Sequence, residues 1–146
     1  MTGSRTILLP TDGSATAEAA ARIAEDLARA EGGQVLVLGV ARRAFVGSAE
    51  DYDLTEAVVE SVRETVEQEA ARIRQAGVEA EPFVVVAEST HGGILETAAE
   101  RDVHLIVMGT HGRSALARAI LGSTADRVLR HTKVPLVLVP LVGEGG

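Results

Sequence analysis

Residues 105–124 read LIVMGTHGRSALARAILGST, and this stretch decides both the fold class and the kind of site that we expect. It opens with an apolar run, LIVM, which is typical of a buried strand. Glycines follow at fixed spacing: Gly109, Gly112 and then Gly122, which is paired with Ser123. Glycine leaves room for an anion to approach the backbone and adopts the positive φ angles that such a loop needs. The spacing therefore predicts a phosphate site at the end of a strand, although each glycine taken alone is better explained as a turn residue.

A helix is expected to begin at the last glycine and to run from Ser123 to about His131. Ser123 or Thr124 can cap this helix with a side-chain oxygen. The N–H groups of its first turn, together with the positive end of the helix dipole, attract an anion. Arg113 offers planar donors to the same anion, or it faces solvent as many loop arginines do.

Further out, four more apolar runs alternate with segments of helical character, which is typical of repeated βαβ units. None of the runs shows clean alternation of apolar and polar residues, as expected for strands covered by helices on both faces. The five runs are Thr6 to Pro10, Val35 to Val40, Pro82 to Val86, Val103 to Met108 and Pro135 to Pro140. The sequence thus predicts a single α/β domain over residues 1–146 with an open parallel sheet.

The segments between the runs have apolar residues at helical spacing. The first helix is expected after Ser14, a good N-cap, and it ends at Gly32-Gly33. The second spans about 53–77 and the third about 92–101. The apolar face of the first helix is expected to include Ala20, Ile23, Ala24 and Leu27. Residues 41–52 show no period and predict a loop, which either folds over a ligand or only connects two elements.

Polar residues follow two of the expected strands, Thr11-Asp12 after the first and Thr110-His111 beyond the fourth. Ligands of open parallel sheets bind beyond the carboxyl ends of the strands, so Asp12 faces the glycine segment if these two strands are neighbours. Asp12 can accept hydrogen bonds from a base or ribose, or help to hold a magnesium ion that bridges phosphates. It can equally cap the helix that follows.

Catalytic equipment is not evident in the sequence. His111 is expected to be an exposed loop residue, because no nucleophile pairs with it. No two of the four histidines have the spacing of three or four residues that puts zinc ligands on one helical face. Cysteine is absent, which excludes disulfides and thiol nucleophiles. The P-loop, the dinucleotide loop and the nucleophile elbow are absent as well, so binding is better supported than catalysis.

Composition narrows the partners. The chain is 46% hydrophobic but only 2% aromatic, which predicts an aliphatic core. A net charge of −7 argues against an extended basic surface for nucleic acid. No apolar stretch approaches the length of about 20 residues needed to cross a bilayer, and the N-terminus lacks the apolar region of a signal peptide. We therefore expect a cytoplasmic protein with neither a nucleic-acid nor a membrane partner.

The segment from Leu105 to Pro140 resembles the ATP-binding branch of the universal stress protein family, and residues 7–14, ILLPTDGS, are similar to that family's first strand and turn. This resemblance implies five parallel strands in the order 3-2-1-4-5 with helices on both faces, a Rossmann-like fold similar to that of the adenine nucleotide alpha hydrolases. Two departures stand out. The chain has residues 88–92, ESTHG, where the family often has Gly-x-Pro, and His104 where it often has Asp.

The resemblance also implies a ligand, which is ATP held with magnesium as a regulatory or sensing molecule. AMP or ADP is an alternative, because a glycine loop does not count phosphates. No catalytic residue and no metal-ligating side chain is assigned. The implied contacts are Pro10, Thr11, Asp12 and Val40 for adenine, Met108 and Gly109 for ribose, and Gly112, Arg113, Gly122, Ser123 and Thr124 for phosphates. Val40 and Met108 are otherwise ordinary core residues.

The last strand predicts a partner. Residues 134–140, VPLVLVP, contain an apolar strand whose first residue is Pro135, and Pro is tolerated at a strand start or a sheet edge. An exposed apolar edge invites pairing, and the resemblance implies a homodimer through this strand. The alternative is that residues 141–146 cover it.

Two other functions stay open at this level. The chain is a slow ATPase or an autophosphorylating phosphotransfer enzyme if Asp12 or His111 serves as a base. It is a nucleotide-free protective interaction protein if the glycine segment binds nothing, although a scaffold would not need the clearance that glycines give.

Overall fold

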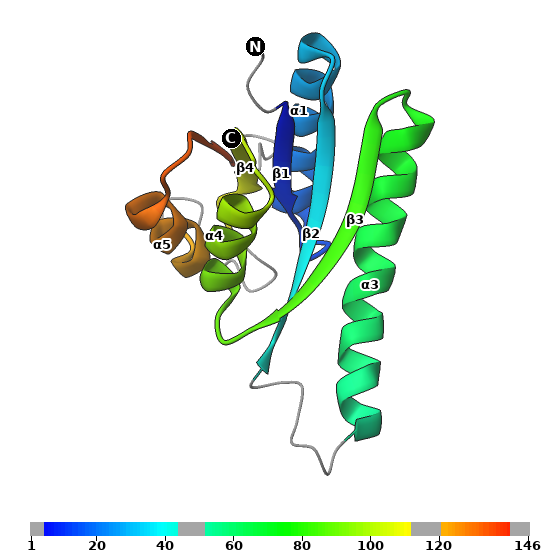
Figure 1. Cartoon of the computed structure of the whole chain (residues 1–146), viewed down its shortest axis with the longest axis vertical. Helices are drawn as coiled ribbons and strands as arrows, with labels where there is room; N and C mark the ends of the chain where they lie inside the picture. Colours follow the sequence, from blue (N-terminus) through cyan, green and yellow to red (C-terminus); the bar gives the residue numbers. More distant parts are fainter. Residues whose placement is uncertain (1–4, 44–51, 112–120, 141–146) are drawn as a thin grey trace, which may run out of the picture.

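Five parallel strands form one sheet in the order β3-β2-β1-β4-β5 (Figure 1). The computed structural model describes residues 5–43, 52–111 and 121–140. The central strand β1 pairs with β2 on one side and with β4 on the other. The strands are β1 Thr6–Pro10, β2 Gln34–Arg42, β3 Glu79–Ala87, β4 Leu105–Gly109 and β5 Leu136–Val139. The fold class and the strand order expected from the sequence are confirmed.

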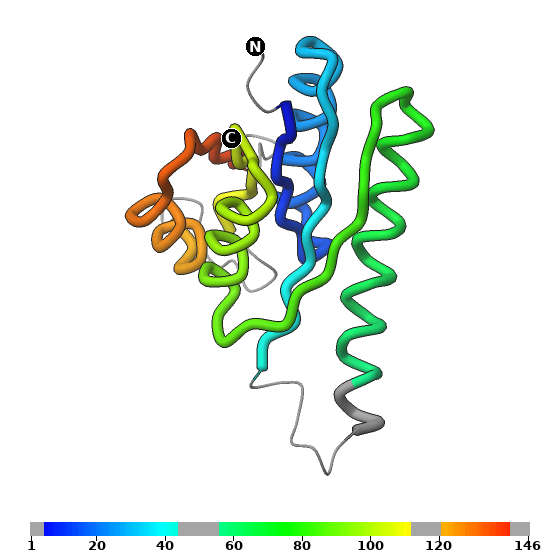
Figure 2. The backbone as a smooth tube through the Cα atoms, viewed as in Figure 1, coloured from blue at the N-terminus to red at the C-terminus, as the bar shows by residue number. Residues whose placement is uncertain are grey.

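Helices cover both faces of this sheet (Figures 1 and 2). The helices are α1 Ala15–Glu31, α3 Tyr52–Gln75, α4 Thr90–Glu100 and α5 Ser123–His131. One core lies under α1 and α3 and includes Ile7, Val37 and Ile73. The other lies under α4 and α5 and includes Leu8, Ile94 and Ile106. Both cores are aliphatic, as the composition predicts.

Helix α1 begins and ends where its caps predict. The Ser14 hydroxyl accepts a hydrogen bond from the Ala17 amide at 3.3 Å, and Gly32 closes the helix with a φ of 69°. Its buried face differs from the expected one, because Ile23 is 38% exposed while Ala17, Ala20, Ala21, Ala24 and Ala28 are buried. The interpretation of Ile23 as a core residue was wrong, since the helix turns its smallest side chains toward the sheet and so approaches it closely.

The starts of α4 and α5 correct two further expectations. Helix α4 begins at Thr90, two residues before the expected start, because Ser89 is its N-cap and accepts from the Gly92 amide at 3.0 Å. Helix α5 begins at Ser123 as expected, but its N-cap is Gly122 and no side chain caps it. The prediction that Ser123 or Thr124 is the cap was wrong.

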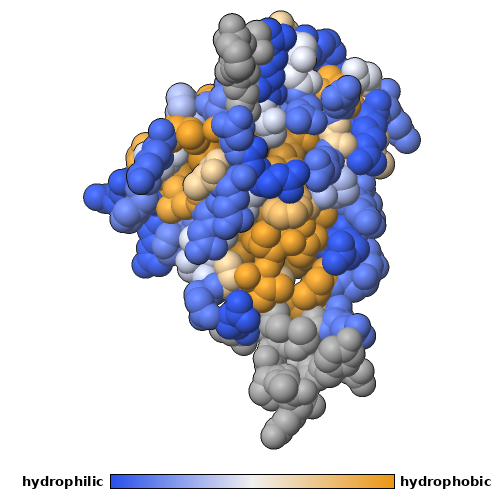
Figure 3. All heavy atoms as spheres, viewed as in Figure 1, coloured by the Kyte–Doolittle hydropathy of each residue, from blue (hydrophilic) through white to orange (hydrophobic). Residues whose placement is uncertain are grey.

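Strands β2 and β3 are longer than the apolar runs that predicted them. Residues 34–38 of β2 pair with β1, whereas all nine residues of β2 pair with β3. The last four residues of β2, from Gly39 to Arg42, therefore extend beyond the end of β1, and Arg42 lies in a strand where a loop was expected. The rest of that expected loop, residues 44–51, lies outside the described residues. Figure 3 shows apolar atoms over β2 and β3 beside α4, where Val86 is 38% exposed.

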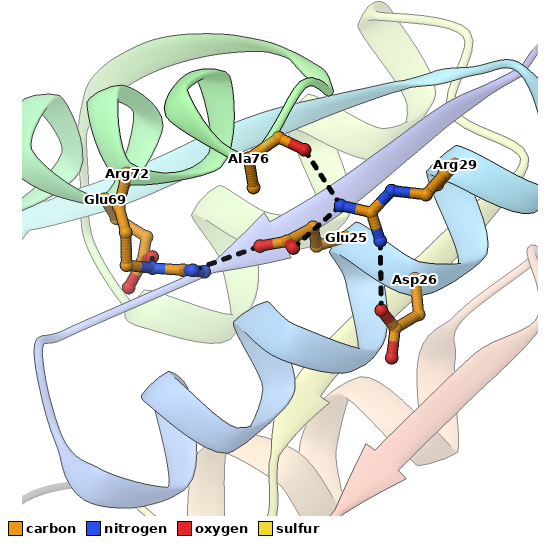
Figure 4. Close-up of polar contacts among 6 residues, drawn as sticks. All are labelled: Glu25, Asp26, Arg29, Glu69, Arg72 and Ala76. Carbon is orange, nitrogen blue, oxygen red and sulfur yellow. Dashed lines mark hydrogen bonds and ion pairs between the residues drawn. The ribbon is translucent and has the colours of Figure 1, made fainter.

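An ionic network joins α1 to the end of α3 on the face of the sheet that these two helices cover (Figure 4). Glu25 of α1 accepts from Arg29 and from Arg72 of α3, each at 3.0 Å. Arg72 also donates to Glu69 at 2.5 Å, and Arg29 donates to the carbonyl oxygen of Ala76 at 3.0 Å. These bonds hold the two helices side by side where their shared core ends.

Candidate functional site

A cavity of about 670 Å³ opens at the carboxyl ends of β1 and β4. Nine of the eleven residues proposed from the sequence line it: Pro10, Thr11, Asp12, Val40, Met108, Gly109, Gly122, Ser123 and Thr124. The other two, Gly112 and Arg113, lie outside the described residues. The volume falls within the range of about 300 to 1,000 Å³ that small-molecule sites span.

The turn after β1 forms one wall of the cavity. The Thr11 amide donates to the Leu38 carbonyl oxygen at 2.9 Å, which ties the turn to β2. The Thr11 hydroxyl accepts from the Gly13 amide at 3.1 Å, and Asp12 Oδ1 accepts from the Ser14 amide at 2.9 Å. Asp12 therefore stabilises the turn before α1 and lines the cavity at the same time, whereas the N-cap of α1 is Ser14 and not Asp12, contrary to one interpretation of the sequence.

Gly109 and Gly122 are required by backbone packing. A Cβ atom on Gly109 would lie 2.6 Å from Thr16 Oγ1, and one on Gly122 would lie 2.7 Å from the Thr110 carbonyl oxygen. Neither glycine has a positive φ; Gly122 sits at −62°. The expectation of left-handed backbone at these two glycines was wrong. They let α1 and the start of α5 approach the turn at Thr110 and His111.

The start of α5 forms the opposite wall. Its first two residues, Ser123 and Thr124, line the cavity, and its N-cap, Gly122, has no side chain that could accept from the N–H groups of the first turn. Those N–H groups have no partner within the helix, so they and the positive helix end favour an anion. Asp126 also lines the cavity, but both of its carboxylate oxygens accept from Arg130 Nε, at 3.0 and 3.1 Å.

Apolar side chains line the cavity between these two walls. Leu38 and Val40 of β2, Ile94 of α4 and Met108 of β4 all contribute. Leu38 and Ile94 were missed as site residues. Each belongs to an apolar strand or helix face, and the sequence does not show which residues of such a face line a cavity. Thr90 was missed because α4 was expected to begin later, although Ser89 followed by Gly92 is a recognisable start signal.

The electrostatics of the cavity come mainly from backbone and carboxylates. No lysine or arginine is among the described residues that line it, while Asp12 and Asp126 are. His91 follows the lining residue Thr90, and burial of its ring together with the positive charges of Arg127 and His131 lowers its pKa. His91 is therefore mainly uncharged at neutral pH. In the part of the chain that the structure covers, no three His, Asp or Glu side chains gather as a metal site.

His111 and His104 lie in different places. His111 lines the cavity, half-buried, with Nδ1 2.9 Å from Thr110 Oγ1, so it lies outside helices and strands as expected but is less exposed than expected. His104 lies at the other end of β4, with Nδ1 2.9 Å from the Thr6 carbonyl oxygen and Nε2 2.8 Å from Glu31. These contacts give His104 a structural role at the start of the fourth strand.

A parallel sheet in this order, which brings Asp12 and the start of α5 to one cavity, is what the resemblance implied. The model of the universal stress protein family matches residues 3–140. The chain belongs to the universal stress protein family. The assignment made from residues 105–140 and 7–14 is thereby confirmed.

Similar members of the family come from bacteria and archaea. A universal stress protein of Thermus aquaticus is 30% identical over 135 residues, which cover 92% of this chain and 98% of that protein. The solved structure of protein MJ0577, from Methanocaldococcus jannaschii, superposes with a TM-score of 0.84 at 26% identity and covers 94% of this chain and 96% of that chain.

One solved relative carries a nucleotide. The universal stress protein of Archaeoglobus fulgidus in complex with dAMP is 25% identical, with a TM-score of 0.71 over 95% of this chain and 99% of that chain.

Among the helices of this chain that the structure describes, none is long and apolar enough to span a bilayer.

Proposed function

We propose that this universal stress protein binds ATP in the cavity between β1, β4 and α5, as a regulatory or sensing ligand in the stress response. The observation that carries the proposal is the composition of the cavity lining. Apolar side chains stand between a turn of hydrogen-bonding groups and a helix start whose N-cap is a glycine. The apolar side chains and the turn suit a base and a ribose, and the helix start suits a phosphate chain.

The assignment of parts follows the chemistry of each group. Val40 and Met108 offer flat apolar contact to adenine and ribose, and the Asp12 turn offers acceptors to the polar edge of a base or to a hydroxyl. Ser123 and Thr124, with the positive end of α5, take the phosphates. Gly112 and Arg113 are proposed as further phosphate contacts from the sequence pattern.

We include magnesium in this proposal because its positive charge offsets the negative charge of the phosphates. Two carboxylates, Asp12 and Asp126, are among the described residues that line the cavity, and Asp126 pairs with Arg130. A magnesium ion bridging the phosphates lowers the net negative charge that they bring to these carboxylates. Magnesium usually keeps several waters and binds through one or two carboxylates and the phosphates, so it does not need a cluster of protein ligands.

Calorimetric titration of the purified protein tests the proposal. ATP, ADP and AMP are titrated separately, with and without magnesium chloride, and GTP is the control for base recognition. We expect heat from adenine nucleotides and a weaker or absent signal from GTP. The absence of binding by all three adenine nucleotides at millimolar concentration would overturn the proposed function. The nucleotide that binds most tightly identifies the physiological ligand class.

A regulatory role, with slow or absent hydrolysis, is supported by the same lining. Fast phosphoryl transfer relies on cations that neutralise the transferring group and on a residue that orients the nucleophile. The described lining offers neither a lysine nor an arginine, and the His111 ring lies against Thr110 Oγ1. We place this function in the cytoplasm, where a chain without cysteine needs no oxidising compartment to fold.

We further propose that two copies associate through β5. This strand is at the edge of the sheet, and each of its four residues is only half-buried. An apolar edge strand with unpaired backbone groups is a surface that a second copy covers by a two-fold contact.

A further inference from the structure

Thr16 is a buried polar residue where α1 meets the fourth strand. The described part of the chain buries two polar side chains, Thr16 at 5% exposure and Thr97 at 2%. Thr97 donates to the Gly93 carbonyl oxygen at 2.8 Å, within its own helix. Thr16 instead donates from α1 to the carbonyl oxygen of His111, which is 95 residues away in the chain. Its hydrogen bond therefore joins two separate elements of the site.

On one side, Thr16 is connected to the Asp12 turn. Ser14 donates its backbone N–H to Asp12 Oδ1 at 2.9 Å, and its hydroxyl lies 3.4 Å from Thr16 Oγ1. A threonine hydroxyl has one proton, and here it goes to the His111 carbonyl oxygen. The Ser14 hydroxyl is therefore the donor in its contact with Thr16, and the bonds run in one direction from Ser14 to His111.

On the other side, the turn that Thr16 holds is in contact with the start of α5. The Gly122 amide donates to the Thr110 carbonyl oxygen at 2.8 Å. The His111 carbonyl that Thr16 holds and the Thr110 carbonyl that Gly122 holds belong to consecutive residues, so one short turn is fixed from both sides. The missing Cβ atoms of Gly109 and Gly122 permit both approaches.

We propose that Thr16 is a positioning residue of the nucleotide site. Its hydroxyl fixes the turn at Thr110 and His111, and through Gly122 it sets the distance between the Asp12 turn and the phosphate-facing start of α5. This inference rests on the proposed function, because only a ligand that touches both walls needs that distance. Thr16 acts on the ligand through the backbone and does not line the cavity itself.

The test compares Thr16→Val with Thr16→Ser, which keeps the hydroxyl. Thr16→Ala is the second variant, because it removes the hydroxyl without placing a methyl group against the His111 carbonyl oxygen. Thr97→Val is the matched control, since it removes the other buried threonine hydroxyl, which donates within its own helix and not to the turn. Thermal unfolding of each variant reports its global stability.

Two readouts separate the positioning role from general destabilisation. The first is amide hydrogen exchange of Gly122 in the ligand-free protein, measured by NMR. We expect Thr16→Val and Thr16→Ala to speed this exchange about tenfold or more, as the loss of one buried hydrogen bond implies, while Thr16→Ser and Thr97→Val leave it unchanged. The second is the affinity for ATP and AMP, which we expect to fall about tenfold in Thr16→Val and to return in Thr16→Ser.

The outcomes are distinguishable. Wild-type exchange at Gly122 in both Thr16→Val and Thr16→Ala would overturn the positioning role, and so would an equal affinity loss in Thr97→Val. If the wild-type protein binds neither ATP nor AMP, the proposed function fails, yet the exchange measurement still decides whether Thr16 holds the turn. If exchange changes and affinity does not, the hydroxyl holds the turn without setting the site, and the inference is wrong.

Discussion

Arg72 of α3 donates to the Glu25 carboxylate of α1 at 3.0 Å, across 47 residues of sequence (Figure 4). The Glu25 side chain keeps only 13% of its exposure, while that of Arg72 keeps 44%. Burial of the Glu25 carboxyl on its own raises its pKa, but the hydrogen bonds and positive charges of Arg29 and Arg72 outweigh burial, and the pKa is lower than usual. Glu25 is therefore charged in the folded protein at neutral pH and stabilises the contact of α1 with α3.

The first prediction concerns stability and pH. Glu25→Gln removes the charge, and we expect it to lower the free energy of unfolding at pH 7 by about 1 kcal/mol, the upper end for partly exposed ion pairs. A lowered pKa in the folded state gives stability that is present above the unfolded value of 4.5 and is lost as pH falls through the folded value. Urea unfolding at pH 7 and pH 3 measures both proteins. A difference that stays constant down to pH 3 would contradict this assignment.

The second prediction concerns Gly122. An alanine Cβ there would lie 2.7 Å from the Thr110 carbonyl oxygen, so Gly122→Ala forces the turn and the start of α5 apart. We expect ATP affinity to fall about tenfold or more, since contacts with one wall are lost while the fold persists. Gly77→Ala is the control: nothing lies within 4 Å of its Cβ, but its φ of 88° strains alanine. That variant should lose stability and keep affinity, and the reverse pattern would contradict the role of Gly122.

The third prediction concerns the charge of Asp12. Asp12→Asn keeps an oxygen that accepts from the Ser14 amide, so the turn before α1 should remain. We expect the variant to bind ATP with magnesium about tenfold more weakly, the effect of losing a charged hydrogen-bonding or metal-bridging group. Calorimetry with and without magnesium measures it. An undiminished magnesium effect in Asp12→Asn would show that Asp12 is not involved with the ion.

The fourth prediction concerns hydrolysis. We expect phosphate release from ATP to stay below about one turnover per minute, because the described lining adds no lysine or arginine to the charge of magnesium at a transferring phosphoryl group. A coupled phosphate assay at saturating ATP measures the rate. Faster release that Asp12→Asn or His111→Ala removes, while binding persists, would make the protein an ATPase instead of a nucleotide-responsive regulator.

The fifth prediction concerns the edge strand β5. Its Pro135 and Val139 carbonyl oxygens accept from amides of Ile106 and Thr110, so the backbone groups of Leu136 and Leu138 point away from β4. Leu138→Pro removes one outward N–H without breaking the pairing of β5 with β4. Light scattering after size-exclusion chromatography should show a dimer for the wild type and a monomer for this variant. A variant that remains dimeric would place the contact elsewhere on the molecule.

Features set by local chemistry could be predicted from the sequence. Ser14 and Gly32 mark the ends of α1 because a hydroxyl cap and a left-handed glycine act within one turn of the helix. The strand order came from resemblance, since spacing alone does not say which strands are neighbours. Nine proposed site residues could be placed at one edge because the carboxyl ends of β1 and β4 meet there.

Features set by contacts between distant segments could not be predicted. Position 109 needs glycine because a Cβ there would meet Thr16, and position 122 needs glycine because a Cβ there would meet the Thr110 carbonyl oxygen. Both neighbours belong to other elements of the chain. Ile23 was expected in the core, but α1 packs its alanines against the sheet instead. Which face of the helix is buried can be seen only in the packed structure. Thr16 reads as an unremarkable first-turn residue until the His111 carbonyl oxygen is found against it.

The overhang of β2 beyond β1 gives the cavity two separately adjustable ends. Val40 lies on this overhang, where a Cβ on Gly93 of α4 would come within 3.0 Å of its side chain. On the α3 side, a Cβ on Gly39 would lie 2.9 Å from Val66. Lengthening or shortening β2 after Leu38 would reshape the end proposed for the base, while the start of α5, proposed for the phosphates, would keep its shape. Base preference and phosphate affinity can therefore diverge independently between proteins that share this sheet.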